Sequence, residues 1–155
     1  MRRAWLTLSA VTVLLGGCSD AAPPVPDRTV KTGTMGAAVT REGIFEYTVG
    51  SVDCAGSAPR LCTVGLTVHN LSGTPRKPGI SFAKLYDARG TAYLADALAQ
   101  IRGDTRLLDD LAAGAAVADR LYYDVPADAT ISKLELREEP SSPGITIDVP
   151  GRRNT

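Results

Sequence analysis

Three cysteines and a single histidine are the side chains in this 155-residue sequence that are best suited to nucleophilic, redox or metal chemistry. A thiol can be acylated, oxidised to a disulfide or bound to a metal, and an imidazole can act as a general base. Cys18 stands alone near the start of the chain, whereas Cys54 and Cys62 form a pair with seven residues between them. The two settings indicate two different roles.

The pair Cys54 and Cys62 is best explained as a structural disulfide. In an exported protein, which the first residues indicate, two thiols this close in sequence are oxidised to a bridge. Closing so short a loop stabilises a fold by about 2.5 kcal/mol. The alternatives are a metal pair and a redox dithiol. A zinc site needs more ligands than one histidine adds, and the C-x-x-C spacing of redox enzymes is absent. We therefore expect no metal site and no cofactor.

The other polar residues form no recognised catalytic motif. The sequence has neither a Gly-x-Ser-x-Gly elbow nor a phosphate-binding glycine loop. His69 lies on the polar face of an expected strand, and general-base catalysis needs a nucleophile and an orienting group beside it. Asp104, Asp109 and Asp110 suggest calcium, but their spacing does not match an EF-hand loop. No catalytic residue is predicted.

The first seventeen residues have the layout of an export signal. Arg2 and Arg3 precede the uncharged run 4–15, and two glycines follow. The run is too short to span a bilayer, which takes about 20 apolar residues. Leu15-Gly16-Gly17-Cys18 resembles a bacterial lipobox, which implies that Cys18 is acylated and becomes the first residue of the mature chain. The alternative is an ordinary signal with a chance cysteine. The sequence predicts a protein anchored by lipid to the extracytoplasmic face of a bacterial cell membrane.

Composition divides the chain into four segments. Residues 1–17 are the signal peptide, and residues 18–35, rich in Pro, Ala, Thr and charge, are predicted to be the acylated N-terminus and a flexible tether. Residues 36–150 form one domain, and residues 151–155 are a short basic tail. The domain has fifteen acidic and eleven basic residues, a formal charge of −4, which argues against nucleic acid as a partner.

Apolar residues alternate along the predicted domain with a period of two. The alternation is clearest in five segments: 45–49, 62–68, 117–125, 134–136 and 145–149. Many short strands of this kind, separated by turn residues, predict an all-β fold, a two-sheet sandwich. Helical spacing occurs only in Leu94, Leu98 and Ile101. At most one short helix, ended by Gly103, is therefore expected in the connection 96–116.

The order of three motifs resembles a known family. The motifs are Val68-x-Asn70, Leu85-Tyr86-Asp87-x-x-Gly90 and Tyr123-Asp124-Val125-Pro126. They are similar to the telokin-like, immunoglobulin-like domain of unknown function found in lipoproteins of Gram-positive bacteria, which is related in fold to the secreted immunoprotective antigen of mycobacteria. The resemblance covers about residues 43–149 and departs at Ala113-Gly114-Ala115, where the family often has Pro-Gly-Glu. It implies an immunoglobulin-like sandwich and export, but no established activity.

Two classes of function remain after these observations. The first is a membrane-anchored, non-catalytic binding module, with an envelope protein or polymer as its partner and the outer sheet faces and the connection 96–116 as contact surfaces. The second is an enzyme or metal-binding envelope protein whose site is assembled from scattered Asp, Tyr and Arg residues. A deep pocket that joined His69 to carboxylates would favour the second class; a shallow sheet face favours the first.

Overall fold

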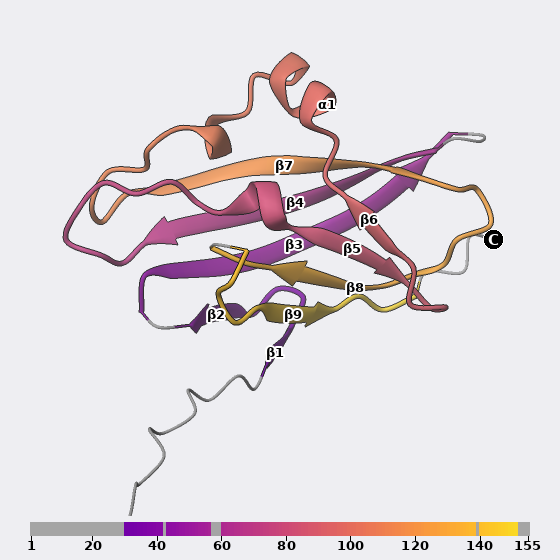
Figure 1. Cartoon of the computed structure of the whole chain (residues 1–155), viewed down its shortest axis with the longest axis horizontal. Helices are drawn as coiled ribbons and strands as arrows, with labels where there is room; N and C mark the ends of the chain where they lie inside the picture. The colour runs from indigo at the N-terminus through magenta and orange to yellow at the C-terminus, as the bar shows by residue number, and fades with distance from the viewer. Residues whose placement is uncertain (1–29, 42, 57–59, 139, 152–155) are drawn as a thin grey trace, which may run out of the picture.

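The computed structural model of the chain describes residues 30–41, 43–56, 60–138 and 140–151. The predicted signal peptide, the predicted acylation site Cys18 and most of the predicted basic tail lie outside these residues. In the described part, nine strands form two sheets that pack face to face (Figure 1). The predicted all-β sandwich is confirmed.

The first sheet has five strands in the order β1-β9-β8-β5-β6. β1 runs parallel to β9, and the other neighbours are antiparallel. The bounds are Lys31–Thr34 for β1, Lys84–Asp87 for β5, Ala92–Leu94 for β6, Ile131–Leu136 for β8 and Ile145–Asp148 for β9.

The second sheet has four antiparallel strands in the order β2-β3-β4-β7. Its bounds are Ala38–Arg41 for β2, Phe45–Ala55 for β3, Arg60–Asn70 for β4 and Ala116–Val125 for β7. The apolar rows predicted from the period of two point inward from both sheets and fill the space between them. Phe45, Val64, Leu121, Leu134 and Ile147 are each at most 1% exposed.

A β-bulge in β3 resolves a conflict in the sequence pattern. Phe45 and Val49 occupy odd positions, whereas Val52 and Cys54 occupy even positions, so strict alternation would place the two pairs on opposite faces. The pairing with β4 shifts directly after Val49. One extra residue, Gly50, is accommodated there, and such an insertion reverses the facing of the residues that follow. The bulge therefore lets both halves of β3 turn their apolar side chains toward the core.

The N-terminal boundary of the domain differs from the prediction. The sequence predicts a tether as far as residue 35, but Lys31–Thr34 form β1 and pair with β9. The strand carries no apolar row, so periodicity does not reveal it; backbone pairing forms it instead. Gly33 lets the backbone of β1 lie close to the Ile147 side chain of β9, because a Cβ at position 33 would lie only 3.0 Å from Ile147 Cδ1.

One connection crosses from the first sheet to the second and covers the β7 edge. It contains α1 (Ala97–Arg102) and the 3-10 turn η2 (Arg106–Leu108), and α1 lies above β7 in Figure 1. A second 3-10 turn, η1 (Ile80–Phe82), precedes β5. Asp96 caps α1, since its carboxylate accepts from the Leu98 and Ala99 backbone N–H groups, and Gly103 ends the helix. This is the short helix that the sequence predicts. None of the helices in the described part has the length and hydropathy of a membrane-spanning segment.

Candidate interaction surface

The two cysteines of the domain form the predicted disulfide. Cys54 and Cys62 lie directly opposite each other on β3 and β4, and their sulfurs are bonded at 2.03 Å. Cys62 is buried in the core and Cys54 packs against it. The bridge links β3 and β4 near the end of their hairpin, which is the position of a structural disulfide.

His69 lies on the outer face of the four-stranded sheet. Its Nε2 is 3.2 Å from Gly114 O, which fits a donor at Nε2, and its Nδ1 is 3.8 Å from the carboxylate of Glu46 on β3. No hydrogen bond joins this imidazole to a hydroxyl or thiol of another described residue. The arrangement is that of a solvated cross-strand pair and not of a base beside a nucleophile.

The acids of the connection are spread along it and do not converge. In the described residues, no group of three His, Cys, Asp or Glu side chains is arranged to hold a metal ion. Asp119, which the sequence analysis did not single out, has a structural task instead. Its Oδ2 accepts from the Thr105 hydroxyl at 3.0 Å and from the Arg106 backbone N–H at 2.8 Å, and thereby fixes η2 on β7.

The first family motif ends in a buried asparagine that ties two loops together. Asn70 is 0% exposed, and its Nδ2 donates to Thr74 O, Leu111 O and Ala112 O at 2.8, 2.8 and 3.2 Å. Its Oδ1 accepts from the backbone N–H and the hydroxyl of Ser72. Both ends of the amide are satisfied, so Asn70 serves the fold.

The second motif contains a buried aspartate in the β5–β6 turn. Asp87 Oδ1 accepts from the backbone N–H groups of Arg89 and Thr91 at 2.9 and 2.8 Å, and Oδ2 accepts from the Tyr93 hydroxyl at 3.0 Å. Burial acts to raise the pKa of Asp87, but the hydrogen bonds from Thr91, Tyr93 and Arg89 outweigh burial and hold that pKa below its usual value. The carboxylate therefore stabilises this turn as an anion.

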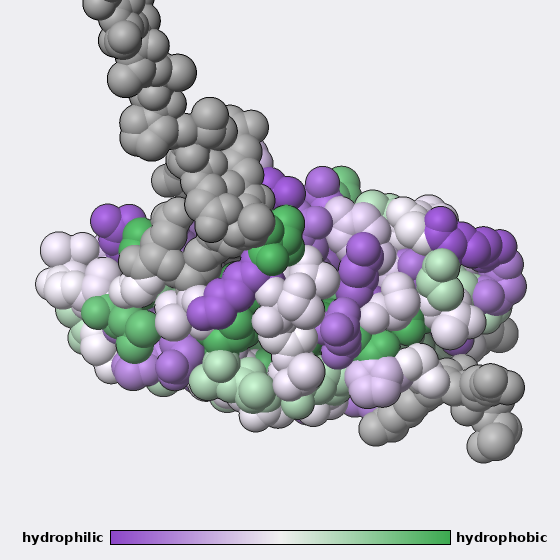
Figure 2. Space-filling view, turned by 90° about the horizontal axis from the view of Figure 1, so that it is seen from below, coloured by the Kyte–Doolittle hydropathy of each residue, from purple (hydrophilic) through white to green (hydrophobic). Residues whose placement is uncertain are grey.

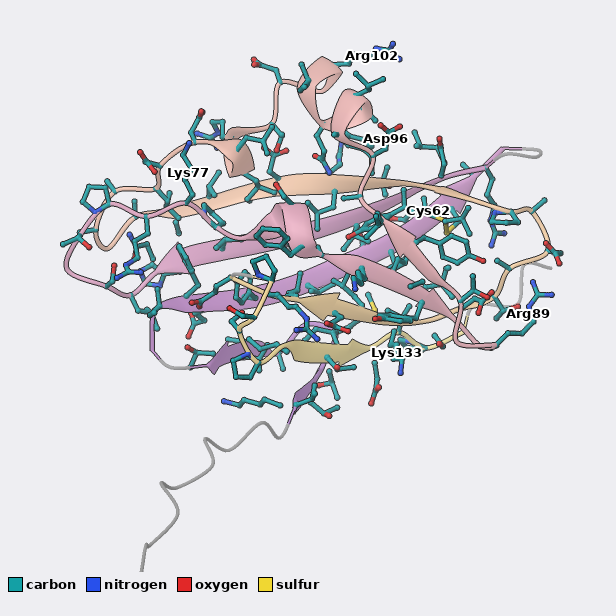
Figure 3. The ribbon with its side chains drawn as sticks, viewed as in Figure 1. Cys62, Lys77, Arg89, Asp96, Arg102 and Lys133 are labelled. Atoms are coloured by element: carbon teal, nitrogen blue, oxygen red, sulfur yellow. A yellow bond between two sulfur atoms is a disulfide. The ribbon has the colours of Figure 1, made fainter. Side chains whose placement is uncertain are left out.

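Helix α1 presents its apolar side chains to solvent. Leu98 and Ile101 on α1 are 62% and 66% exposed, and Leu94, at the end of β6, is 64% exposed. We call these three residues the apolar ridge. The residue that α1 turns toward the sheet is Gln100, which is buried. Figure 3 shows α1 standing out from the sandwich, with Asp96 at its base and Arg102 at its outer end. In an ordinary amphipathic surface helix the apolar face packs on the core. In α1 the apolar face points to solvent and a polar residue faces the sheet.

Gln100 faces the backbone of the β7 edge. In the amide orientation that satisfies both groups, its nitrogen lies 3.1 Å from Arg120 O and its oxygen 3.0 Å from Tyr122 N. The Asp96 backbone N–H also donates to Tyr122 O at 2.7 Å. The helix is therefore attached to the sheet by hydrogen bonds rather than by its leucine and isoleucine, which leaves these two free for another contact.

A shallow groove of about 580 Å³ runs beside α1 on the outer face of the four-stranded sheet. Gly50 and Gly65 form part of its floor, and Gly103 and Tyr122 form part of its wall. Larger residues would force neighbouring side chains to move: a Cβ on Gly65 would lie 2.9 Å from Ser51 Oγ, and one on Gly103 would lie 3.0 Å from the Tyr122 ring. The groove and the apolar ridge together form the candidate interaction surface.

The opposite side of the molecule is different in character. Figure 2 shows the side of β1, β2 and β9, where the coloured hydrophilic and hydrophobic residues are intermixed. Scattered apolar residues of this kind are normal on a protein surface, whereas grouped ones mark contact sites. The connection 96–116 carries exposed apolar side chains on α1. The sequence did not indicate which side of α1 faces outward.

One mixed and one antiparallel sheet with a filled core between them, a short helix over one edge and a shallow outer groove define an all-β sandwich of the immunoglobulin-like class. The chain belongs to the family described as domain of unknown function (DUF4352), whose model matches residues 28–146. The resemblance that the three motifs indicated is therefore confirmed.

Solved structures with the same fold come from several bacteria. The secreted protein MPT63 of Mycobacterium tuberculosis is 14% identical, with a TM-score of 0.61 over 78% of this chain and 98% of that one. The yjhA protein of Bacillus subtilis is 15% identical, with a TM-score of 0.54 over 76% and 98%. An uncharacterised β-sandwich protein of Clostridium difficile 630 is 10% identical, with a TM-score of 0.53 over 83% and 100%. At these identities the likeness shows the fold. No curated protein matches the sequence significantly.

Proposed function

We propose that this protein is a lipoprotein of the bacterial cell envelope whose sandwich is a non-catalytic binding module, held at the outer side of the membrane by acylated Cys18. The order of basic residues, apolar run, small residues and cysteine in residues 1–18 supports export and acylation. The fold relative MPT63 is described as a secreted protein, which agrees with export. The position of β1 leaves residues 19–30 to connect the anchor with the folded domain.

The observation that carries the binding proposal is the apolar ridge. Removing an apolar side chain from water is worth about 25 cal/mol per Å² of buried area, so a helix that served only the fold would turn Leu98 and Ile101 inward. Both are instead more than 60% exposed while Gln100 is buried. Grouped exposed apolar side chains on a small domain mark a surface that another molecule covers.

The surroundings of the ridge favour a protein as the partner. Protein interfaces have an apolar centre within a polar rim. Here the ridge lies beside a groove whose lining includes Thr48, Thr67 and Arg120, and Tyr122 adds an aromatic ring with a hydroxyl. Tyrosine and arginine are enriched at such interfaces. We infer that an envelope protein places an apolar segment on the ridge and polar groups in the groove.

The anchor is tested by Cys18→Ala. The variant is expected to lose acylation and to move from the membrane fraction to the soluble fraction, because the acyl chains supply the membrane affinity. Fractionation and intact-mass spectrometry measure both effects. The double variant Cys54→Ala/Cys62→Ala is the matched control and remains in the membrane. A Cys18→Ala protein that stays membrane-bound would contradict the anchor.

The binding surface is tested by photo-crosslinking in intact cells. A benzophenone side chain at position 98 is expected to form a defined protein adduct, and Ile101→Glu is expected to abolish it by placing a charge in the apolar contact. The same probe at Thr32, exposed on β1, is the control and gives no such adduct. Identical adducts from both positions, or an adduct that survives Ile101→Glu, would contradict the proposal. Because the anchor and the surface are tested separately, either can fail alone.

A further inference from the structure

Arg60 is a cation inside the end of the sandwich. It begins β4, and its side chain has the same inward facing as Cys62 and Val64, two and four residues later. Its cross-strand neighbour is Val125, at the end of β7. Only 8% of Arg60 is exposed, so this guanidinium lies at the margin of the apolar core and not on the surface.

The guanidinium of Arg60 has few hydrogen-bond partners and no ion-pair partner among the described residues. Nη2 donates to Ala129 O, in the loop between β7 and β8. Nε is buried and has no hydrogen-bond partner among the described residues. None of the ion pairs found in the described part of the chain includes Arg60. A guanidinium has five N–H donors and carries its charge at physiological pH, and a buried charge without a counter-ion is unfavourable. The guanidinium of Arg60 therefore lacks a counter-ion among the described ion pairs.

A hollow of about 530 Å³ adjoins Arg60. It lies between the end of β3, the start of β4, the β7–β8 loop and the residues that follow β9, all at the end of the molecule toward which β9 points in Figure 1. Its volume falls within the range of about 300–1,000 Å³ that is usual for small-ligand sites. Val52, Ile131 and Val149 give it apolar walls, and Asp53 and Asp128 also line it.

We propose that this hollow binds a small organic carboxylate with an apolar body. The carboxylate would pair with the guanidinium of Arg60, and the apolar body would lie against Val52, Ile131 and Val149. A guanidinium pairs well with the planar carboxylate. Inorganic phosphate fits less well, because it offers nothing to the apolar walls, and its greater negative charge is repelled by Asp53 and Asp128. The site is separate from the apolar ridge and the groove, and so goes beyond the proposed function.

Hexanoate is a suitable probe, with hexanamide and inorganic phosphate as its comparisons. The ¹⁵N-labelled full chain carrying Cys18→Ala is titrated with each compound, and the Arg60 Nε–H resonance and the methyl resonances of Val52 and Ile131 are followed. Hexanoate is expected to shift these resonances saturably. Hexanamide lacks the charge and phosphate lacks the apolar body, so each is expected to bind at least about tenfold more weakly, the factor that corresponds to one charged hydrogen bond.

Two variants and a control decide the outcome. Arg60→Gln is expected to weaken hexanoate binding at least about tenfold, while Arg76→Gln, an exposed arginine far from the hollow in sequence, leaves it unchanged. Ala127→Trp, at an exposed position that lines the hollow, is expected to obstruct binding without altering the core. Absence of saturable binding, equal binding of hexanamide, or unchanged binding in Arg60→Gln would overturn the proposal. If Arg60→Gln does not fold, unchanged hexanoate binding in Ala127→Trp would overturn it.

Discussion

The two ends of β4 carry two buried polar side chains with opposite hydrogen-bonding states. Asn70, at the C-terminal end, uses both its amide nitrogen and its oxygen on neighbouring loops. Arg60, at the N-terminal end, makes one hydrogen bond to Ala129 O and leaves Nε without a described partner. Burial alone therefore does not reveal what a polar residue does. A satisfied group holds the fold together, and an unsatisfied one points to a missing partner.

The largest effect is expected from Asn70→Ala. The substitution removes the hydrogen bonds from Asn70 Nδ2 to the carbonyls of Thr74, Leu111 and Ala112, and those from the Ser72 backbone N–H and hydroxyl to Oδ1. Each hydrogen bond contributes about 0.5–1.5 kcal/mol to stability. Since neighbouring loops can admit water, we expect a loss of about 3 kcal/mol in the free energy of unfolding, measured by urea denaturation. His69→Ala, on the exposed face of the same strand end, is the control and changes stability by less than about 0.5 kcal/mol. Equal losses in the two variants would contradict the stabilising role of the Asn70 hydrogen bonds.

Removal of the disulfide tests the other end of the strand. The double variant Cys54→Ala/Cys62→Ala is expected to lose about 2.5 kcal/mol and to remain folded, because the bridge closes a short loop and the core is otherwise unchanged. Thermal melting and urea denaturation measure the loss. Reduction of the wild-type protein should give the same shift. Free thiols at these positions in protein taken from cells would contradict the bridge.

Asp87→Asn tests a third buried polar group, with a smaller effect that depends on pH. Because the folded-state pKa of Asp87 lies below its usual value, its stabilisation is fully present above the unfolded pKa of about 3.9 and is lost as the pH falls through the folded pKa. The melting temperature of the variant should therefore fall below that of the wild type at pH 7, and the two should converge toward pH 2. Asp148→Asn, at an exposed position on β9, should show no such pH-dependent difference. A gap of constant size would contradict the role of the ionised carboxylate.

Arg60→Met should have the smallest effect on stability. Replacing an unpaired buried cation by an apolar side chain of similar length is often neutral or stabilising, so we expect a change within about 1 kcal/mol of zero in the absence of ligand. Urea denaturation beside Asn70→Ala makes the comparison directly. A loss as large as that of Asn70→Ala would mean that Arg60 is as essential to the fold as Asn70.

Much of this comparison could be predicted from the sequence, because strand alternation fixes side-chain facing. The buried apolar positions of β4 are Cys62, Val64, Leu66 and Val68, which are all even, and Arg60 and Asn70 continue the same series. Extending the alternation by one step at each end therefore predicts that both polar ends point inward, a step that the sequence analysis did not take. The partners could not be predicted, because Ala129 and Leu111 come from loops that only the tertiary fold brings near.

Other features escaped the sequence for separate physical reasons. The bulge after Val49 depends on pairing between β3 and β4, although the change of parity between Val49 and Val52 was a readable sign of it. The facing of α1 was hidden because helical spacing shows that Leu98 and Ile101 share a side, but not whether that side meets the sheet. β1 was missed because its residues have no apolar alternation and acquire their strand form by pairing with β9.

The cover that Gln100 and Asp96 place over β7 has a consequence for molecules crowded on a membrane. β7 is a ten-residue strand at the edge of its sheet, and an uncovered edge of that length is a template on which another chain can add a strand and aggregate. Arg120 O, Tyr122 N and Tyr122 O are already engaged by the α1 segment. A domain tethered as we propose meets copies of itself at high local density, and the occupied backbone groups at this edge hinder the addition of another strand to β7.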